Sequence, residues 1–283
     1  MEKTLVYHLY ITENFLDNIA YKVHSYCLRK YIKVFDKVKF TVSLNDLSRH
    51  DLIAHAYEWI NSLGFDKETQ ITVIQNGELG ETETFKREIL DMNNDGMVFF
   101  AHSKGVGRLI EGKINSSVLT WVLLLYYENF ANVEEIERCF LNMPLHSSVF
   151  YGTMVIGSVR NEPLKNAFGM HYSGNFFWVN MPKYKNWRKT GRIPDLEPDG
   201  RWFTETYPGT VCKFEHMGGG MNTRDCIWFE METVQAYKMD RNEWEDIFWN
   251  YQNNDGMGSL IDEVYNFIGV DNIDFENKTE WDG

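Results

Sequence analysis

Small, hydrogen-bonding and aromatic residues follow one another between His171 and Trp178, in the order His-Tyr-Ser-Gly-Asn-Phe-Phe-Trp. Gly174 allows a ligand to approach the backbone, and Asn175 offers a donor and an acceptor together. The three rings at 176–178 have flat apolar faces, which suit the C–H faces of a sugar. This composition is typical of a sugar-binding loop. It is also that of an aromatic strand in a core, which composition alone favours.

His102-Ser103-Lys104-Gly105 is the second candidate for chemistry, because it directly follows a hydrophobic run that ends at Ala101. Ligands of open α/β sheets bind outside the carboxyl ends of the strands, so these residues would lie at the mouth of the crevice. A diphosphate there could pair with Lys104, hydrogen-bond to Ser103 and approach the backbone at Gly105. A solvated turn after a strand is the alternative.

Glu205 is the best candidate for a catalytic carboxylate, because it stands among aromatic residues in the segment from Arg201 to Gly209. Partial loss of solvent would make it a stronger base. A surface ion pair with Arg201 explains the same residue without a function. His171 is open to two explanations as well: a ring satisfied by backbone groups in the core, or a neutral donor to a sugar or a phosphate.

The sequence lacks the motifs of several other enzyme classes. It contains no HExxH zinc motif, no GxGxxG or Walker A phosphate loop and no GxSxG nucleophile elbow. His216 to Gly220 is a glycine-rich turn that could bind a ligand. Glu81 and Glu83 can be explained by the positive end of the helix that they begin. The absence of these motifs therefore argues against a hydrolase and against a metal site formed by the histidines.

Charge and composition limit the partners and the compartment. The formal net charge of −13 and an isoelectric point near 5.1 argue against binding to nucleic acid or to an anionic membrane. The longest apolar run, Val118 to Tyr127, is too short to span a bilayer, and no secretory signal is visible. No CxxC pair occurs among the cysteines, which are Cys27, Cys139, Cys212 and Cys226. We expect a cytoplasmic protein with reduced thiols and no transmembrane segment.

Strand patterns and helix patterns alternate along the first part of the chain, which predicts an α/β domain. Strands are expected at 5–11, 38–42, 71–74 and 97–101, and helices at 15–26, 53–60 and 81–90. The fourth strand is apolar on both faces, which is typical of the centre of a helix-covered parallel sheet.

The pattern is less regular in the second part of the chain. Helices are expected at 121–129 and 133–141, strands at 149–156 and 226–231, and amphipathic helices at 244–251 and 260–267. The segment from Asn253 to Gly258 would separate the last two helices. Four of the six prolines lie between Pro182 and Gly209, which predicts an irregular loop able to fold over a ligand.

Five segments, taken in order, resemble a family of glycosyltransferase-like domains from bacterial polysaccharide clusters and large DNA viruses. The family pattern is E-x-x-T-L, then H-[ST]-K-G, then H-x-S-G-N-[FW]-W, then an R…E pair. The matching segments are Glu81-Thr82-Glu83-Thr84-Phe85, Phe100 to Gly105, Trp121, His171 to Trp178, and Arg201 with Glu205. The resemblance covers about residues 5 to 210. Phe85 replaces the usual leucine, and Phe177 stands where an aromatic residue is expected, so both keep the apolar role.

This resemblance implies a GT-A-like, Rossmann-like fold, with a mainly parallel sheet flanked by helices and with further helices at the C-terminus. Residues 1–283 would form one glycosyltransferase domain. Within it, 1–105 would be the nucleotide-sugar-binding half, 106–232 the acceptor-binding and catalytic half, and 233–283 a helical extension. The donor would lie across the carboxyl ends of the first strands.

The resemblance also implies roles for individual residues. The donor would be bound by Ile11, Thr12, Glu81, His102, Ser103, Lys104 and Gly105. The donor or the acceptor would be contacted by His171, Ser173, Gly174, Asn175, Trp178 and Arg201. Glu205 would be the catalytic base.

The implied reaction transfers a hexosyl, deoxyhexosyl or pentosyl group from a nucleotide-diphosphate sugar to a glycan acceptor. We expect inversion, and a retaining reaction stays open because these motifs do not determine the stereochemistry. Many GT-A enzymes hold Mn²⁺ or Mg²⁺ with an Asp-x-Asp motif, which this chain lacks. Lys104 would supply the positive charge instead, so a metal is not expected to be required. Asp91 or Asp95 leaves open a metal bound from the preceding loop. A noncatalytic carbohydrate-binding protein and a nucleotide-sugar hydrolase are the alternatives.

Overall fold

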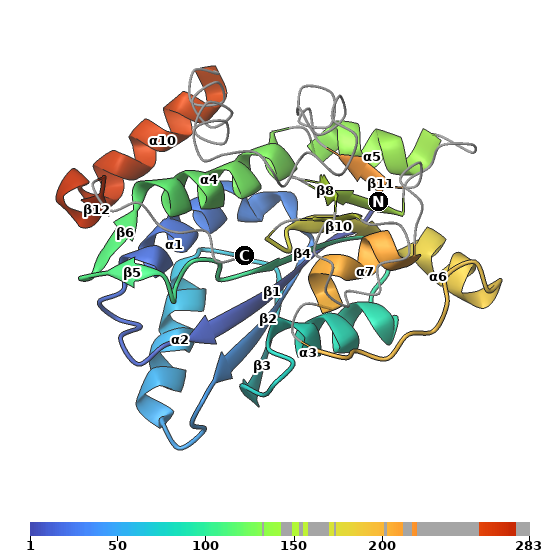
Figure 1. The fold of residues 1–283 in the computed structure, drawn as a ribbon, viewed down its shortest axis with the longest axis horizontal. Coiled ribbons are helices and arrows are strands. Elements are labelled where there is room, and N and C mark those ends of the chain that lie inside the picture. Colours follow the sequence, from blue (N-terminus) through green and yellow to red (C-terminus); the bar gives the residue numbers. More distant parts are fainter. Residues whose placement is uncertain are drawn as a thin grey trace.

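The computed structural model describes residues 1–131, 133–142, 149–152, 155–157, 170–172, 174–200, 203–211, 217–219 and 255–275. Within these residues, one central sheet has the strand order β11-β7-β10-β4-β1-β2-β3 (Figure 1). Helices flank the sheet on both faces, and most neighbouring strands are parallel. The expected α/β class with a mainly parallel sheet is confirmed.

Four parallel strands form the first half of the sheet: β1 (Lys3–Ile11), β2 (Lys37–Leu44), β3 (Glu68–Gln75) and β4 (Met97–His102). All four were expected from the hydrophobic pattern. The edge strand β3 is largely exposed, whereas β4 is buried up to Ala101. Burial on both faces explains why the β4 sequence shows no alternation of polar and apolar residues.

In the second half of the sheet only β10 runs in the opposite direction, whereas β7 and β11 run in the same direction as β4. β10 (Phe177–Asn180) pairs antiparallel with both β4 and β7 (Phe150–Gly152), and β11 (Met217–Gly219) pairs parallel with β7. Two small sheets complete the strands, one of β5 (Leu109–Ile110), β6 (Lys113–Asn115) and β12 (Ile273–Asp274), the other of β8 (Val155–Gly157) and β9 (Met170–Tyr172). The expected strand at 149–156 is therefore divided between β7 and β8.

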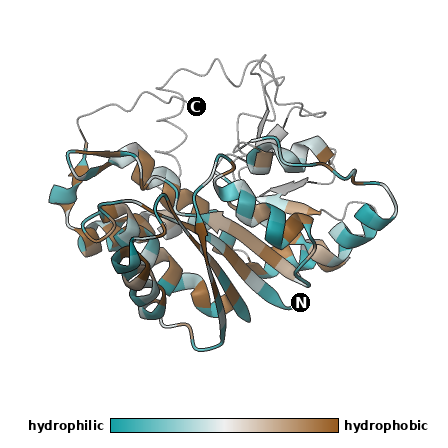
Figure 2. Cartoon of the chain, turned by 90° about the horizontal axis from the view of Figure 1, so that it is seen from below, coloured by the Kyte–Doolittle hydropathy of each residue, from teal (hydrophilic) through white to brown (hydrophobic). Residues whose placement is uncertain are grey.

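Larger helices cover the face of the sheet to which Leu5, Tyr7 and Leu9 contribute. They are α1 (Ile19–Tyr31), α2 (His50–Ser62), α4 (Ser116–Phe130) and α10 (Asp255–Ile268), with α5 (Val133–Asn142) adding Ile136 and Phe140 to the same core. Helix α1 begins at Asn18, whose side chain accepts a hydrogen bond from the Ala20 amide. Figure 2 shows the hydrophobic colours concentrated on the central strands.

The opposite face, to which Val6, Val98 and Phe100 contribute, is covered by α3 (Glu81–Phe85) with the π-helical turn Lys86–Leu90, by α6 (Met181–Lys189) and by α7 (Phe203–Val211). The helix expected at 81–90 is thus present, in two parts. These helices carry the second aromatic core, which includes Phe85, Tyr184 and Tyr207.

The expectation of an irregular loop from Pro182 to Gly209 is wrong for much of that segment, which contains α6 and α7. Pro182 lies in the first turn of α6, where a missing N–H costs nothing, and the Asn180 side chain caps the helix by accepting from the Lys183 amide. Pro208 lies inside α7, and its segment is held by Phe203, Tyr207 and Val211 in the core. Tertiary burial therefore outweighs the proline signal.

Two further expectations concern the C-terminal part. Helix α10 begins at Asp255, so the predicted break from Asn253 to Gly258 is wrong at its end. The strand expected at 226–231 and the helix at 244–251 lie outside the described residues.

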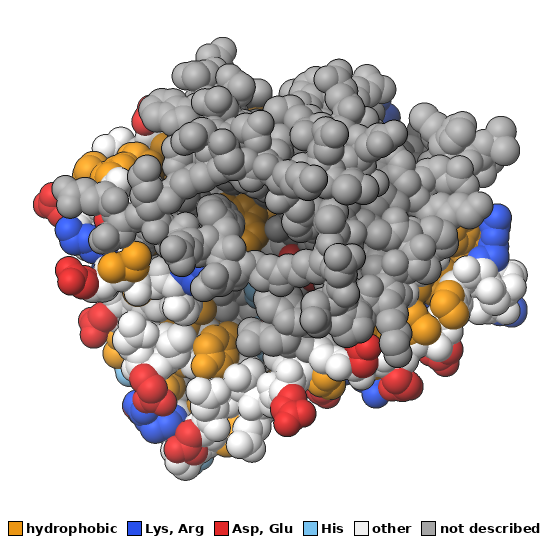
Figure 3. Space-filling model, in the orientation of Figure 1, with side chains coloured by type: hydrophobic (Ala, Val, Ile, Leu, Met, Phe, Trp, Pro, Cys, Tyr) orange, Lys and Arg blue, Asp and Glu red, His pale blue; other side chains and the backbone are white. Residues whose placement is uncertain are grey.

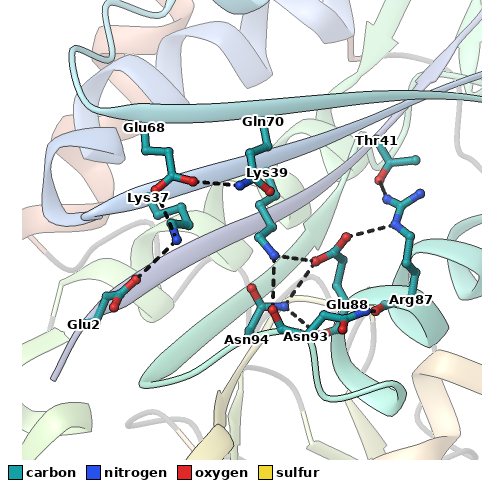
Figure 4. Close-up of polar contacts among 10 residues, drawn as sticks. All are labelled: Glu2, Lys37, Lys39, Thr41, Glu68, Gln70, Arg87, Glu88, Asn93 and Asn94. Atoms are coloured by element: carbon teal, nitrogen blue, oxygen red, sulfur yellow. Dashed lines mark hydrogen bonds and ion pairs between the residues drawn. The ribbon is translucent and has the colours of Figure 1, made fainter.

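A partly buried ion-pair cluster fixes the π-helical turn to β2 (Figure 4). Lys39 Nζ lies 2.9 Å from Glu88 Oε2, Arg87 Nε donates to Glu88 Oε1 at 2.9 Å, and Arg87 Nη2 donates to Thr41 Oγ1 at 2.5 Å. Burial raises the pKa of Glu88, but the hydrogen bonds from Lys39 and Arg87 outweigh burial and hold the pKa below its usual value. The cluster anchors the segment that carries Glu81 toward the strand ends.

Candidate functional site

The strand order reverses between β1 and β4, because β2 and β3 lie on one side of β1 and β4 lies on the other. Ligands of open α/β sheets bind at such a switch point, outside the carboxyl ends of the strands. These ends are Ile11 and His102. The sequence placed His102-Ser103-Lys104-Gly105 at this position, and the structure agrees.

Backbone and side-chain bonds tie the two strand ends together. The Ser103 amide donates to His8 O at 3.0 Å, and the Tyr10 amide donates to Ser103 Oγ at 3.0 Å. Ser103 is only 4% exposed, so its hydroxyl joins the strands. The Ile11 side chain is buried in the core, whereas Thr12 is half-buried and its amide donates to Tyr21 Oη at 3.1 Å.

Gly174 lies where three parts of the site meet, just before β10. Its carbonyl oxygen accepts from His102 Nε2 at 3.0 Å, and its amide donates to Glu205 Oε1 at 3.0 Å. Its φ is +93°, and a Cβ atom would lie 2.8 Å from Leu125 Cδ1. The backbone conformation favours glycine here, and a larger residue would also require the buried Leu125 side chain to shift. The loop thus links the β4 end to the carboxylate at the start of α7.

Asn175 also has a positive φ, +57°, although it is not glycine, and it is only 2% exposed. Its Nδ2 donates to Glu81 Oε1 at 3.2 Å. Its Oδ1 is buried and contacts no donor in the part of the chain that the structure describes. An unsatisfied buried acceptor is costly, and backbone strain at such a residue is common in binding sites. This oxygen suits a hydroxyl or N–H group of a ligand.

The first turns of α3 and α7 meet beside this loop. Thr82 Oγ1 and Thr204 Oγ1 are 2.9 Å apart, which joins the two helix starts. Each start carries a half-exposed carboxylate, Glu81 on α3 and Glu205 on α7, and each carboxylate binds the 174–175 loop through one oxygen. Negative charge is favourable at a helix N-terminus, which helps to explain the placement of both.

Cationic side chains adjoin the same loop through the ring of Trp121. Lys104 Nζ is 4.4 Å from the centre of the Trp121 ring, and the Arg108 guanidinium carbon is 5.8 Å from it. Trp121 Cζ2 lies 3.5 Å from where a Cβ of Gly174 would be. The indole ring therefore adjoins Gly174 and also carries the two cations. Positive charge and the Glu205 carboxylate therefore both lie near one loop.

The buried His24 holds the backbone of Lys104 in place. His24 Nε2 donates to Lys104 O at 2.8 Å, so Nδ1 is the acceptor that faces the hydroxyls of Tyr7 (3.0 Å) and Tyr126 (2.9 Å). Burial lowers the pKa of His24 to about 4, although the bond to Lys104 opposes the shift. His8, which bonds to Thr84 Oγ1 at 2.8 Å, has its pKa lowered by burial to about 4 as well.

These two histidines predict a loss of stability in mild acid. Because the folded pKa of His24 lies below its unfolded value near 6.5, the unfolded chain binds the extra proton, and the free energy of unfolding falls as the pH falls from 6.5 toward 4. Between pH 7 and pH 5 the loss is about 2 kcal/mol for each histidine.

The variant His24→Gln keeps a donor and an acceptor but cannot titrate, so it should lose about 2 kcal/mol less than the parent over this range. Urea unfolding at pH 7 and pH 5 measures both values. An equal loss in the parent and the variant would show that His24 does not contribute.

The aromatic run at 176–178 does not offer its rings to a ligand, and that expectation is wrong. Phe176, Phe177 and Trp178 are fully buried, and Trp178 Nε1 donates to Asn129 O at 3.1 Å. The reason is the position of β10 between β4 and β7, with helices on both faces. The assignment of Trp178 to a ligand contact is corrected accordingly: its ring belongs to the core.

Of the remaining predicted site residues, the structure explains Gly105 and does not describe the other side chains. Gly105 has a φ of +85° and a Cβ position 3.0 Å from Val118 Cγ1, so close packing against α4 explains the glycine. The backbone of His171 lies in β9, but its side chain is not described. Ser173 and Arg201 lie outside the described residues, so their predicted contacts remain predictions.

The two aspartates considered as metal ligands lie at the wrong end of the sheet. Asp91 and Asp95 precede β4, whereas the crevice lies beyond its last residue, His102. A strand of this length spans about 20 Å. Asp95 also pairs with Lys185 Nζ at 2.6 Å. Among the residues with a described placement, no group of three or more His, Cys, Asp or Glu side chains could hold a metal ion.

Comparisons with known proteins were made at three levels. No family model matches the chain, and no curated protein matches it. Among solved structures, it is similar to residues 1–349 of S. aureus TarS, at 10% identity and a TM-score of 0.35, over 77% of this chain and 58% of that one. The chain thus spans less than two thirds of that TarS structure.

Two further solved structures are similar to the chain, each with a TM-score of 0.35. TarS in complex with UDP-GlcNAc has 10% identity, over 95% of this chain and 72% of that one. The 4-diphosphocytidyl-2C-methyl-D-erythritolsynthase from Anaerococcus prevotii DSM 20548 has 9% identity, over 89% and 99% of the two chains. Among the described helices, none is long and apolar enough to cross a membrane.

Sequence reasoning missed three contributors to the site: Arg108, Leu125 and Thr204. Arg108 follows Lys104 by four positions, and this spacing could have drawn attention to it. Leu125 and Thr204 act through packing and through a bond between distant segments, for which no local sequence signal exists.

Proposed function

We propose that this protein is a glycosyltransferase of GT-A-like fold that moves a sugar from a nucleotide-diphosphate sugar to a glycan acceptor. One observation carries the proposal: a carboxylate and a cation both adjoin one glycine loop at the carboxyl end of β4. Glu205 binds the Gly174 amide, and Lys104 lies over Trp121, whose ring edge adjoins Gly174. Glycosyl transfer needs a base for the acceptor and positive charge for the leaving diphosphate.

In the proposed reaction, the acceptor hydroxyl oxygen attacks the anomeric carbon as the bond from that carbon to the diphosphate oxygen breaks. Glu205 takes the acceptor proton through the oxygen that does not bind Gly174. The nucleoside diphosphate leaves with the bonding electron pair, and Lys104 stabilises its negative charge. Attack from the side opposite to the diphosphate inverts the anomeric centre.

The 174–175 loop would hold the sugar between these groups. The buried Asn175 Oδ1 would accept a hydrogen bond from a sugar hydroxyl, while Glu81 fixes the amide orientation through Nδ2. His102 would keep the loop in place through the Gly174 carbonyl. No step requires a metal ion in this scheme, because the charge on Lys104 serves the diphosphate directly.

A noncatalytic carbohydrate-binding protein is less well supported, because the rings on which that alternative depended are buried in the core. A nucleotide-sugar hydrolase uses the same residues with water as the acceptor. The transferase and hydrolase reactions differ in whether an added glycan acceptor raises nucleotide release.

The test is to incubate the purified protein with UDP-, GDP- and TDP-sugars, with Mn²⁺ or with EDTA, and to measure nucleotide release and the thermal shift. We expect one donor to stabilise the protein, with nucleotide release that rises when a glycan acceptor is added and persists in EDTA. Nucleotide release that does not increase when the acceptor is added would indicate a hydrolase. No response to any donor would contradict the proposal.

A further inference from the structure

Arg108 is a cation near the Trp121 ring that has no role in the family pattern. It is half-buried, and its guanidinium carbon lies 5.8 Å from the centre of the Trp121 ring that also carries Lys104. It makes no ion pair with any residue whose placement is described, in a protein with a formal net charge of −13. A half-buried arginine without a carboxylate is suited to an external anion.

The backbone that carries Arg108 is held in place. The Arg108 amide donates to Gly105 O at 2.9 Å, and Asn18 Nδ2 donates to Val106 O at 2.8 Å. The segment also begins at Lys104, whose carbonyl accepts from the buried His24. Both cations therefore start from a fixed turn at the carboxyl end of β4, which reduces the ordering cost of binding an anion.

A second tryptophan, Trp187, also has a lysine and an arginine near its ring, but this group lies elsewhere in the fold. Lys183 Nζ and the Arg192 guanidinium carbon lie 4.8 Å and 4.6 Å from the centre of the Trp187 ring. That group is on α6 and the turn after it, and α6 directly follows the carboxyl end of β10, which runs antiparallel to β4. It therefore lies at the end of the sheet opposite to the crevice. Figure 3, drawn in the orientation of Figure 1, shows acidic and basic side chains interspersed along the margin that the structure describes.

We propose that Arg108 and Lys104 together bind the diphosphate of the nucleotide sugar, with Arg108 supplying a two-point contact to one phosphate group. A guanidinium presents two parallel N–H donors to a phosphate, whereas an ammonium acts as a point charge. The two positive charges formally balance the two negative charges of the diphosphate in a nucleotide sugar. This inference rests on the proposed function in one respect, since it takes the diphosphate to be part of a nucleotide sugar.

The test measures binding of inorganic diphosphate, UDP and GDP by calorimetry in EDTA, with inorganic phosphate for comparison. We expect diphosphate to bind more tightly than phosphate, and Arg108→Gln to weaken diphosphate and nucleotide binding at least 10-fold. Arg108→Lys should restore part of the loss, because it returns the charge without the second donor. Arg192→Gln, at the matched Trp187 group, should bind as the parent does.

The outcomes separate this inference from the proposed function. Unchanged diphosphate binding in Arg108→Gln, with a thermal melting curve like that of the parent, would overturn the role of Arg108, even if sugar transfer occurs. Equal weakening in Arg192→Gln would overturn it too, because the effect would then be one of total charge. Diphosphate binding that depends on Arg108, without transfer from any sugar donor, would support the anion site and count against the glycosyltransferase.

Discussion

Replacing Glu205 by glutamine should lower the rate of sugar transfer by about 10² to 10⁴-fold, which is the usual contribution of a positioned general base. The amide oxygen of glutamine can still accept from the Gly174 amide, a bond of 3.0 Å in the present structure, so the loop should stay in place. The amide cannot take the acceptor proton. Nucleotide-sugar binding should therefore persist. Initial rates of nucleotide release with an acceptor, together with calorimetric binding, measure the two effects separately.

Glu197→Gln is a suitable control for this variant. Glu197 is an exposed carboxylate that pairs at 3.4 Å with Lys86, the first residue of the π-helical turn that follows α3. Its replacement removes one negative charge without touching the loop, and transfer should continue at the parental rate. Normal transfer by Glu205→Gln would show that the base has been assigned to the wrong residue.

Gly174→Ala should damage both stability and activity. A residue other than glycine at a φ of +93° is strained, and its Cβ would lie 2.8 Å from Leu125 Cδ1. Strain of this kind together with overpacking costs about 2 to 5 kcal/mol in the free energy of unfolding. Any shift of the loop also moves the groups that bind His102 and Glu205. Transfer should fall at least 10-fold even in molecules that remain folded.

Gly112→Ala separates backbone strain from crowding. Gly112 has a φ of +81°, but nothing lies within 4 Å of its Cβ position. This variant should lose about 1 kcal/mol of stability and keep its activity. Urea unfolding and initial rates for both variants provide the comparison. Similar results at Gly112 and Gly174 would contradict the view that contact with Leu125 makes position 174 specific for glycine.

The first half of the fold could be predicted from the sequence because its signals are local. β1 and β4 are runs of hydrophobic residues, and the helices between the strands repeat apolar residues at helical spacing. The position of His102 at the mouth of the crevice then followed from the rule for open α/β sheets. The convergence of Gly174, Asn175 and Glu205 was expected from the family resemblance, and the structure brings these three together by hydrogen bonds through Gly174 and by chain adjacency.

The missed parts depend on contacts between distant segments. Composition could not distinguish a sugar platform from a core strand at Trp178, because only the pairing of β10 with β4 and β7 decides which faces are covered. Prolines misled the prediction for α7, since burial of its aromatic residues is not visible locally. Arg108 gained a role only when the fold placed it over the ring that carries Lys104.

The central place of β4 in the sheet has a consequence for the way the chain folds during synthesis. The bonds that assemble the site, His102 to Gly174, Glu81 to Asn175 and Thr82 to Thr204, join residues 72, 94 and 122 positions apart. While the chain emerges from the ribosome, β1 to β4 can pair early, but β4 then has one open edge with apolar residues on both faces. Such an edge promotes aggregation. Arrival of β10 covers that edge and brings the 174–175 loop to the strand end, so the nascent chain gains protection and this part of the site in the same folding step, before α7 adds Thr204 and Glu205.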